Sequence, residues 1–155
     1  MTRARFLLVL LALVCAVSAE AATRGTKAKY MGGTITAIAE KTEGEFDFSR
    51  EDLAIFTTKK GQAISIPYKN IDSLEFGQKA GRRVGAAVVV SPLFLFSKKR
   101  KHFLSIGYTD DQGQRQGAVF ELAKGIVRTT LSNFETRSGQ EIEYESEEAR
   151  KHAGN

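Results

Sequence analysis

The fold is decided by one stretch, HFLSIGYTDDQGQRQGAVFELAKGIVRTTLSNFETRSG, which spans residues 102–139. Its first half has two apolar runs, 102–108 and 116–123, on either side of the polar turn TDDQGQR, and this pattern predicts a β-hairpin. In its second half five residues recur at helical spacing: Ile126, Val127, Thr130, Leu131 and Phe134. Because Gly139 is a natural helix stop, we expect one amphipathic helix at about residues 125–138.

Short strands are expected in succession upstream of the hairpin. They begin near Tyr30 and then cover residues 46–48, 53–58, 64–68 and 71–76. The pair Gly32-Gly33 predicts a bulge or bend, and Thr42-Glu43-Gly44 predicts a turn. Pro67 lacks an N–H donor, so its strand is expected at a sheet edge or with an irregular end. A run of strands followed by one helix is an α+β order.

The phrase ISIPYKNIDSLEF, residues 64–76, resembles the GRAM and bacterial PH-like families, in which a strand leads into a Y-x-x-I-x-x-L stretch. The order of elements over residues 30–139 also resembles the pleckstrin-homology-like superfold. The resemblance implies an antiparallel β-rich roll or sandwich of about six to seven short strands, capped by one C-terminal amphipathic helix. That superfold hosts lipid-binding, peptide-binding and structural members, so it does not decide function.

One departure from the lipid-binding members concerns the turn after the first strand. Those members resemble one another in a Lys/Arg-rich signature there, whereas residues 41–45 of this chain, KTEGE, are nearly neutral. The resemblance therefore does not extend to inositol-phosphate recognition of the usual kind.

The first 21 residues, MTRARFLLVLLALVCAVSAEA, have the layout of a secretory signal peptide. Two arginines precede an apolar run of about 12 residues, which is too short for a spanning helix of about 20. Cleavage after Ala19 or after Ala21 would leave small residues at the required positions. Val14 before Cys15 departs from a lipobox, which argues against lipidation. We expect export, and whether it ends in a periplasm or outside the cell stays open.

The composition suits one domain behind this segment. The chain has 155 residues, 42% hydrophobic and 26% charged, with a net charge of +5, and this is not the composition of a disordered chain. The single cysteine excludes a disulfide scaffold and argues against a zinc–thiolate site. We expect a flexible segment at 22–29, the domain at 30–139 and an acidic, partly disordered tail at 140–155, in which a strand or a short helix can form through Ile142 and Tyr144.

The unusual segment is GQKAGRRVGAAVVVSPLFLFSKKRKH, residues 77–102. Residues 84–96 form an apolar stretch whose only polar member is Ser91, and basic residues lie on both sides. The candidate membrane or partner contact residues are Lys79, Arg82, Arg83, Val88, Val89, Val90, Leu93, Phe94, Leu95, Phe96, Lys98, Lys99, Arg100 and Lys101. Thirteen helical residues span about 20 Å, less than the hydrocarbon core, so the stretch can enter one leaflet but not cross the bilayer.

Three uses of residues 84–96 stay open. They can be packed inside the domain, can contact a membrane surface, or can dock a protein partner. Leu93 to Phe96 are bulky at every position and do not alternate as a half-exposed strand would. The flanking charges fit an anionic membrane surface or an envelope protein. Export, and the lack of aromatic residues among the charges, argue against nucleic acid.

Catalytic, metal and cofactor sites are not predicted. His102 follows four basic residues, His152 lies in the tail, and no known hydrolase or nucleotide motif occurs. The DDQG sequence at 110–113 lacks the distant Glu of a calcium loop and is interpreted as a hairpin turn. The sequence thus favours an exported, non-enzymatic binding module of PH-like type that associates peripherally with a membrane. The alternative is a structural or assembly domain that docks a protein through the same apolar segment.

Overall fold

The computed structural model describes residues 26–78 and 101–154. The expected signal peptide and residues 22–25 lie outside the described residues. So do the candidate contact residues from Lys79 to Arg100.

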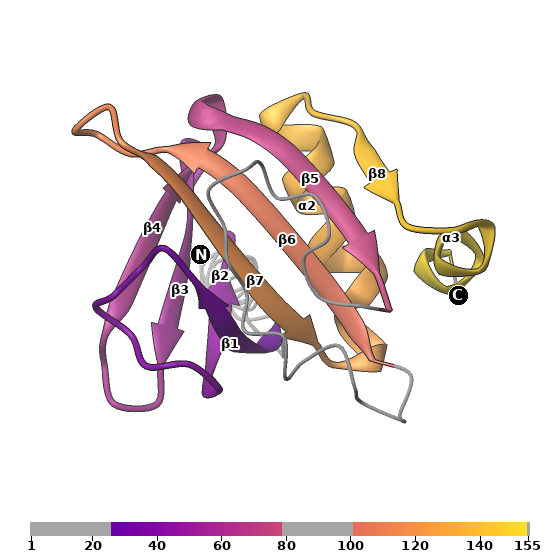
Figure 1. Ribbon diagram of the computed structural model, residues 1–155, viewed down its shortest axis with the longest axis horizontal. Helices are drawn as coiled ribbons and strands as arrows, with labels where there is room; N and C mark the ends of the chain where they lie inside the picture. The colour runs from indigo at the N-terminus through magenta and orange to yellow at the C-terminus, as the bar shows by residue number, and fades with distance from the viewer. Residues whose placement is uncertain (1–25, 79–100, 155) are drawn as a thin grey trace, which may run out of the picture.

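The described strands form one open sheet in the order β4-β3-β2-β1-β7-β6-β5-β8 (Figure 1). All neighbouring strands are antiparallel except β5 and β8. The strands are β1 Lys27–Gly33, β2 Thr42–Asp47, β3 Leu53–Thr58, β4 Ala63–Pro67, β5 Ile71–Gly77, β6 His102–Thr109, β7 Arg115–Leu122 and β8 Ile142–Tyr144. Two C-terminal helices follow, α2 Val127–Ser138 and α3 Glu147–Ala153, and single 3-10 turns cover Tyr68–Asn70 and Lys124–Ile126.

The α+β class is therefore confirmed, and the finer expectation is corrected. Among the described residues there are eight strands in one sheet and two helices, where six to seven strands in a roll or sandwich and one helix were expected. The extra elements, β8 and α3, come from residues 142–153, which were expected to be a partly disordered tail. β8 covers Ile142 to Tyr144, where a strand or a short helix was left open, and it pairs in parallel with β5.

The hairpin and the long helix lie where the sequence predicts them. β6 and β7 pair from His102↔Leu122 to Thr109↔Arg115, and α2 ends at Gly139. Gly139 has a φ of 70°, a left-handed conformation that glycine adopts without steric cost, and its N–H bonds the carbonyl of Glu135. Pro67 is the last residue of β4, which is an edge strand, as predicted.

The sheet changes register in β1, at the predicted Gly32-Gly33 pair. The pairing of β1 with β7 shifts between Tyr30 and Gly32, which is the expected bulge. A side chain at Gly33 would place its Cβ 2.0 Å from the carbonyl oxygen of Gly117, and the residue has a φ of 149°. Only glycine fits this close approach, so the bend depends on Gly33.

Two boundaries near β1 differ from the expectation. β1 begins at Lys27, within the segment expected to be flexible, because its backbone pairs with both β2 and β7. The predicted turn at residues 42–44 belongs to β2 instead, and the chain turns before it. Lys41, which precedes β2, has a left-handed φ of 62°.

The core is a cluster of aromatic rings between the sheet and α2. The ring of Phe134 on α2 lies 5.4 Å from that of Phe46 and meets it edge to face. Phe46 also lies 4.7 Å from Phe120 of β7 and 5.3 Å from Phe56 of β3. Edge-to-face contacts are a preferred aromatic arrangement, so Phe46 joins the helix to strands from both halves of the sheet.

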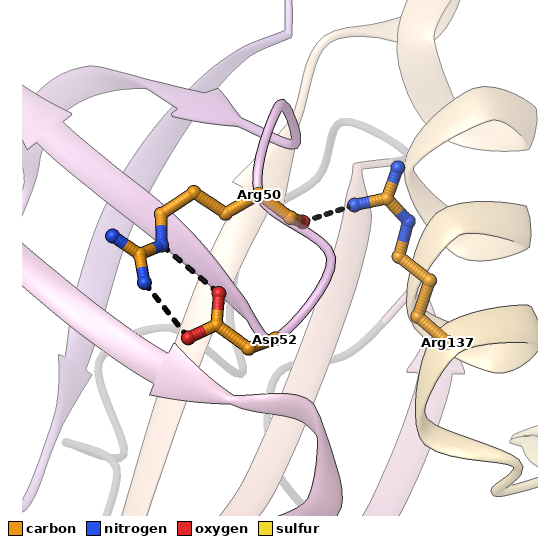
Figure 2. A network of polar contacts seen from close by, with 3 residues as sticks. All are labelled: Arg50, Asp52 and Arg137. Atoms are coloured by element: carbon orange, nitrogen blue, oxygen red, sulfur yellow. Dashed lines mark hydrogen bonds and ion pairs between the residues drawn. The ribbon is translucent and has the colours of Figure 1, made fainter.

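The end of α2 is also tied to the loop before β3. Arg137 Nη1 donates to the carbonyl oxygens of Phe48, at 2.7 Å, and of Arg50. Figure 2 shows this guanidinium directed at the loop, where Arg50 and Asp52 form a two-bonded ion pair at 2.9 and 2.8 Å. The Arg137 guanidinium also lies 5.5 Å from the ring centre of Tyr68. The helix is thus fixed at its far end by polar contacts as well as by the core.

Candidate functional site

Of the fourteen predicted contact residues, only Lys101 lies among the described residues. The places where residues 79–100 leave and rejoin the sheet are nevertheless defined. β5 ends beside the start of β6, since Gly77 is opposite Phe103 in their antiparallel pairing. Residues 79–100 therefore leave and return at one end of the sheet, where β5 ends and β6 begins. We call this end of the molecule the segment end.

Both flanking residues are held by polar contacts. Lys101 Nζ lies 2.8 Å from Glu121 Oε2 on β7, and these side chains are 32% and 25% exposed. On the other side, the backbone N–H of Gln78 donates to Glu145 Oε2 at 2.8 Å. Residues 78 and 101, on the two sides of residues 79–100, are thus anchored, and the pairing of Lys101 fixes where the basic flank ends.

Further lysines gather at the segment end. Lys29 of β1 is opposite Glu121 in the pairing of β1 with β7, and Lys27 lies two residues before it. Lys124 follows β7 and is exposed. The pKa of His102 is lowered, first by burial and then by the positive charges of His152 and Lys124. These lysines come from β1, from the residue before β6 and from the chain after β7, so only the strand pairing brings them together.

A groove of about 620 Å³ runs beside these lysines, over β1, β2 and β3. Its charged lining consists of Lys27, Lys29, Lys59, Glu43, Glu45 and Glu121. Lys59 Nζ lies 2.5 Å from Glu43 Oε2. This hydrogen bond is the largest cause of the lowered pKa of Glu43 and of the raised pKa of Lys59. Three lysines face three glutamates, so the groove has no net charge that would select an anion.

The two histidines, which the sequence places far apart, are neighbours. The His102 ring is stacked 6.0 Å from Phe76, and the His152 ring lies 6.1 Å from His102. His152 thus lies in α3 against the sheet rather than in a frayed tail. Within the described residues no group of three or more His, Cys, Asp or Glu side chains can hold a metal ion.

The turn at 110–113 is the connection of the β6–β7 hairpin, as predicted. The Asp110 carboxylate accepts bonds from the backbone N–H groups of Gln112 and Gln114 and from the side-chain amide of Gln116. The Gln116 bond is the largest cause of the lowered pKa of Asp110. This carboxylate therefore stabilises the turn with its own neighbours.

In residues 26–78 and 101–154, no helix is both long and apolar enough to cross a membrane. No protein-family model matches the chain, and comparison with curated proteins finds no relative.

Proposed function

We propose that this protein is an exported, non-enzymatic binding module that associates peripherally with an anionic membrane surface through residues 79–101. The observation that carries the proposal is the segment end. Residues 79–100 leave and return there, and the exposed Lys124 lies at the same end. Lys27, Lys29 and Lys101 also lie there but face Glu43, Glu45 and Glu121, so the basic flanks would supply most of the net positive charge. The basic flanks and the described lysines thus come from one end of the domain.

The proposed scaffold is PH-like. The antiparallel pairing of successive strands from β1 to β4 and from β5 to β7, with a helix directly after the last of them, supports the resemblance. The aromatic contact of α2 with β2, and that of β2 with β7, support a helix that closes one side of a curved sheet. β8 and α3 would be additions to that scaffold.

The charges would supply most of the attraction. A basic residue close to an anionic leaflet contributes about 1 kcal/mol, and the segment has seven of them. The apolar residues 84–96 can be buried at the boundary of headgroups and acyl chains. Because the attraction is electrostatic, it weakens as salt shortens the Debye length.

Flotation with vesicles tests the proposal. The exported, processed chain, its N-terminus established by mass spectrometry, is mixed with vesicles of phosphatidylcholine alone or of equal parts phosphatidylcholine and phosphatidylglycerol. We expect binding to the anionic vesicles only, and less of it at high salt.

The charge variant replaces Lys98, Lys99 and Arg100 by Gln and keeps Lys101 in its ion pair. Losing three charges of about 1 kcal/mol each should weaken binding about 100-fold. The matched control replaces Arg50, Lys69 and Arg115, exposed residues at the opposite end of the sheet, by Gln. Equal losses in both variants would point to net charge alone. A chain that stays in solution but forms a defined complex with an envelope protein would favour the structural or assembly alternative.

A further inference from the structure

β6 is buried on both faces of the sheet. Its residues alternate between the faces, and Leu104, Ile106 and Tyr108 belong to the core that α2 covers. Phe103 and Ser105 point to the opposite face, yet they are only 2% and 3% exposed. An antiparallel sheet with one solvated face would leave these side chains exposed. Something therefore covers the second face of β6.

The same is true of β7 and of β1 beyond it. On β7, Ala118 belongs to the core and its neighbour Val119 does not, although both are 0% exposed. Met31 on β1 is 4% exposed and also lies outside the core cluster. Val119 is opposite Ser105 on one side and Gly32 on the other, so these residues adjoin. We call Met31, Phe103, Ser105 and Val119 the outer face.

The helices among the described residues do not supply the cover. α2 buries Val127, Leu131 and Phe134 in the core cluster, on the other side of the sheet. α3 contributes Ala149 and Ala153 to that same cluster. A buried apolar face needs another layer against it, so the layer comes from outside residues 26–78 and 101–154.

We propose that the outer face is the docking surface for residues 84–96 of the same chain. Their connection leaves β5 and enters β6, so it begins and ends beside the outer face. The last five residues before Lys101 can span roughly 17 Å when extended. The distance from β6 across β7 to β1 is only roughly 10 Å. Residues 84–96 can therefore reach every residue of the outer face.

Charge placement supports the same occupant. Glu121 lies on β7 with its side chain on the outer side, since it alternates with the core residues Phe120 and Leu122. Its partner Lys101 ends the basic flank, so this ion pair holds the exit of the segment at the rim of the outer face. Residues 1–25, which belong to the chain whose burial is described, are the competing occupant. If the proposed signal peptide is removed, only residues 22–25 of them are left before the described chain.

Docking on the outer face does not depend on the proposed function. It assigns residues 84–96 a place in the protein when no membrane is present. If the segment also meets a membrane, the docked state would compete with the inserted one. The outer face would then be uncovered on anionic vesicles.

Two single-cysteine chains test the docking, each with Cys15→Ser. Val119→Cys places the thiol on the outer face, and Ala118→Cys, the matched control, places it in the core on the adjacent residue. Maleimide labelling should be slow for both in the intact protein. Replacing residues 84–96 by a Gly/Ser linker of the same length should then speed labelling of Cys at 119 by roughly 100-fold, and leave position 118 protected.

Fast labelling of position 119 in the intact protein would overturn the proposal. Continued protection after the replacement would also overturn it, and would assign the cover to the N-terminal residues or to a second copy. If position 118 is also labelled, the replaced chain has unfolded, and a second measurement decides.

That second measurement pairs Val119→Cys with one cysteine at a time from Val88 to Phe96 in the intact chain. We expect an intramolecular disulfide for at least one pair. Disulfides only between chains, or none at all, would contradict docking in cis. The single-cysteine chains mixed with vesicles separate the two proposals. If the cysteine at position 119 stays protected with vesicles and the protein does not float with them, the membrane function is contradicted and the docking is retained.

Discussion

The imidazole rings of His102 and His152 lie 6.1 Å apart, across the contact between β6 and α3. Burial and the nearby charges of His152 and Lys124 lower the pKa of His102. Because of this burial and these positive charges, protonation of His102 is disfavoured in the folded protein. Glu148, whose Oε1 lies 4.0 Å from His152 Nε2, is an acidic group beside His152.

A pH dependence of stability follows from this arrangement. The unfolded chain takes up a proton on His102 near its ordinary pKa of about 6.5, whereas the folded protein takes it up at lower pH. The contribution of His102 is thus complete above about pH 6.5 and is lost as the pH falls through the folded pKa. Urea unfolding at about pH 7.5 and about pH 5.5 measures the loss. His102→Gln should reduce it, and an unchanged difference would contradict the prediction.

Phe134 should be the most sensitive core position of α2. Its ring contacts Phe46 and Phe48 edge to face, each at 5.4 Å, and it is 0% exposed. Phe134→Ala should cost about 3–5 kcal/mol of the free energy of unfolding. Ser132→Ala, at an exposed position on the same helix, should change it by less than about 0.5 kcal/mol. Equal effects in thermal unfolding would show that α2 is not held by its apolar side.

Gly33→Ala should destabilise the protein strongly. The added Cβ would meet the Gly117 carbonyl oxygen at 2.0 Å, and the φ of 149° is strained for any L side chain. We expect a loss of more than about 2 kcal/mol. Gly125→Ala is the control, because nothing lies within 4 Å of its Cβ position. Chemical denaturation of both variants should separate them, and a tolerated Gly33→Ala would show that the bend does not need glycine.

Alkaline pH should unfold the protein through its buried tyrosines. Burial raises the pKa of Tyr30 and of Tyr108 to about 12 in each case. The unfolded chain loses these protons near pH 10, so stability is complete below about pH 10 and falls toward pH 12. Phenolate absorbance and circular dichroism should change together over that window. Full ionisation of all four tyrosines in the folded protein near pH 10 would contradict this prediction.

Local patterns predicted the part of the fold that local interactions determine. The hairpin of β6 and β7, the helix ending at Gly139, the bulge at Gly32-Gly33 and the edge position of Pro67 each follow from a few neighbouring residues. The pairing of β8 did not, because it is parallel with β5, which lies far from it in sequence. The signal for α3 was present but was interpreted as a charge run. Ser146 caps its first turn, two glutamates follow, and Arg150, Lys151 and His152 end it.

The candidate site, too, could be predicted from the sequence only in part. The apolar segment and its basic flanks are visible in the sequence, but their surroundings are not. The ion pair of Lys101 with Glu121 requires the register of β6 and β7, and the nearness of Lys29 requires that of β1 and β7. The run HFLSIGY predicts a strand, yet only the pairing and burial of its residues reveal that it is covered on both sides.

The two margins of the sheet limit how another protein can bind. β4 has five residues and ends in a proline without an N–H, and β8 has only three residues. Short margins of this kind offer few free backbone groups for an incoming strand to pair with. Recognition by strand addition, which many sheet proteins use for extended peptides, is therefore disfavoured along both margins. A partner that binds along these margins would have to use side chains, and its specificity there would depend on charge and shape rather than on backbone pairing.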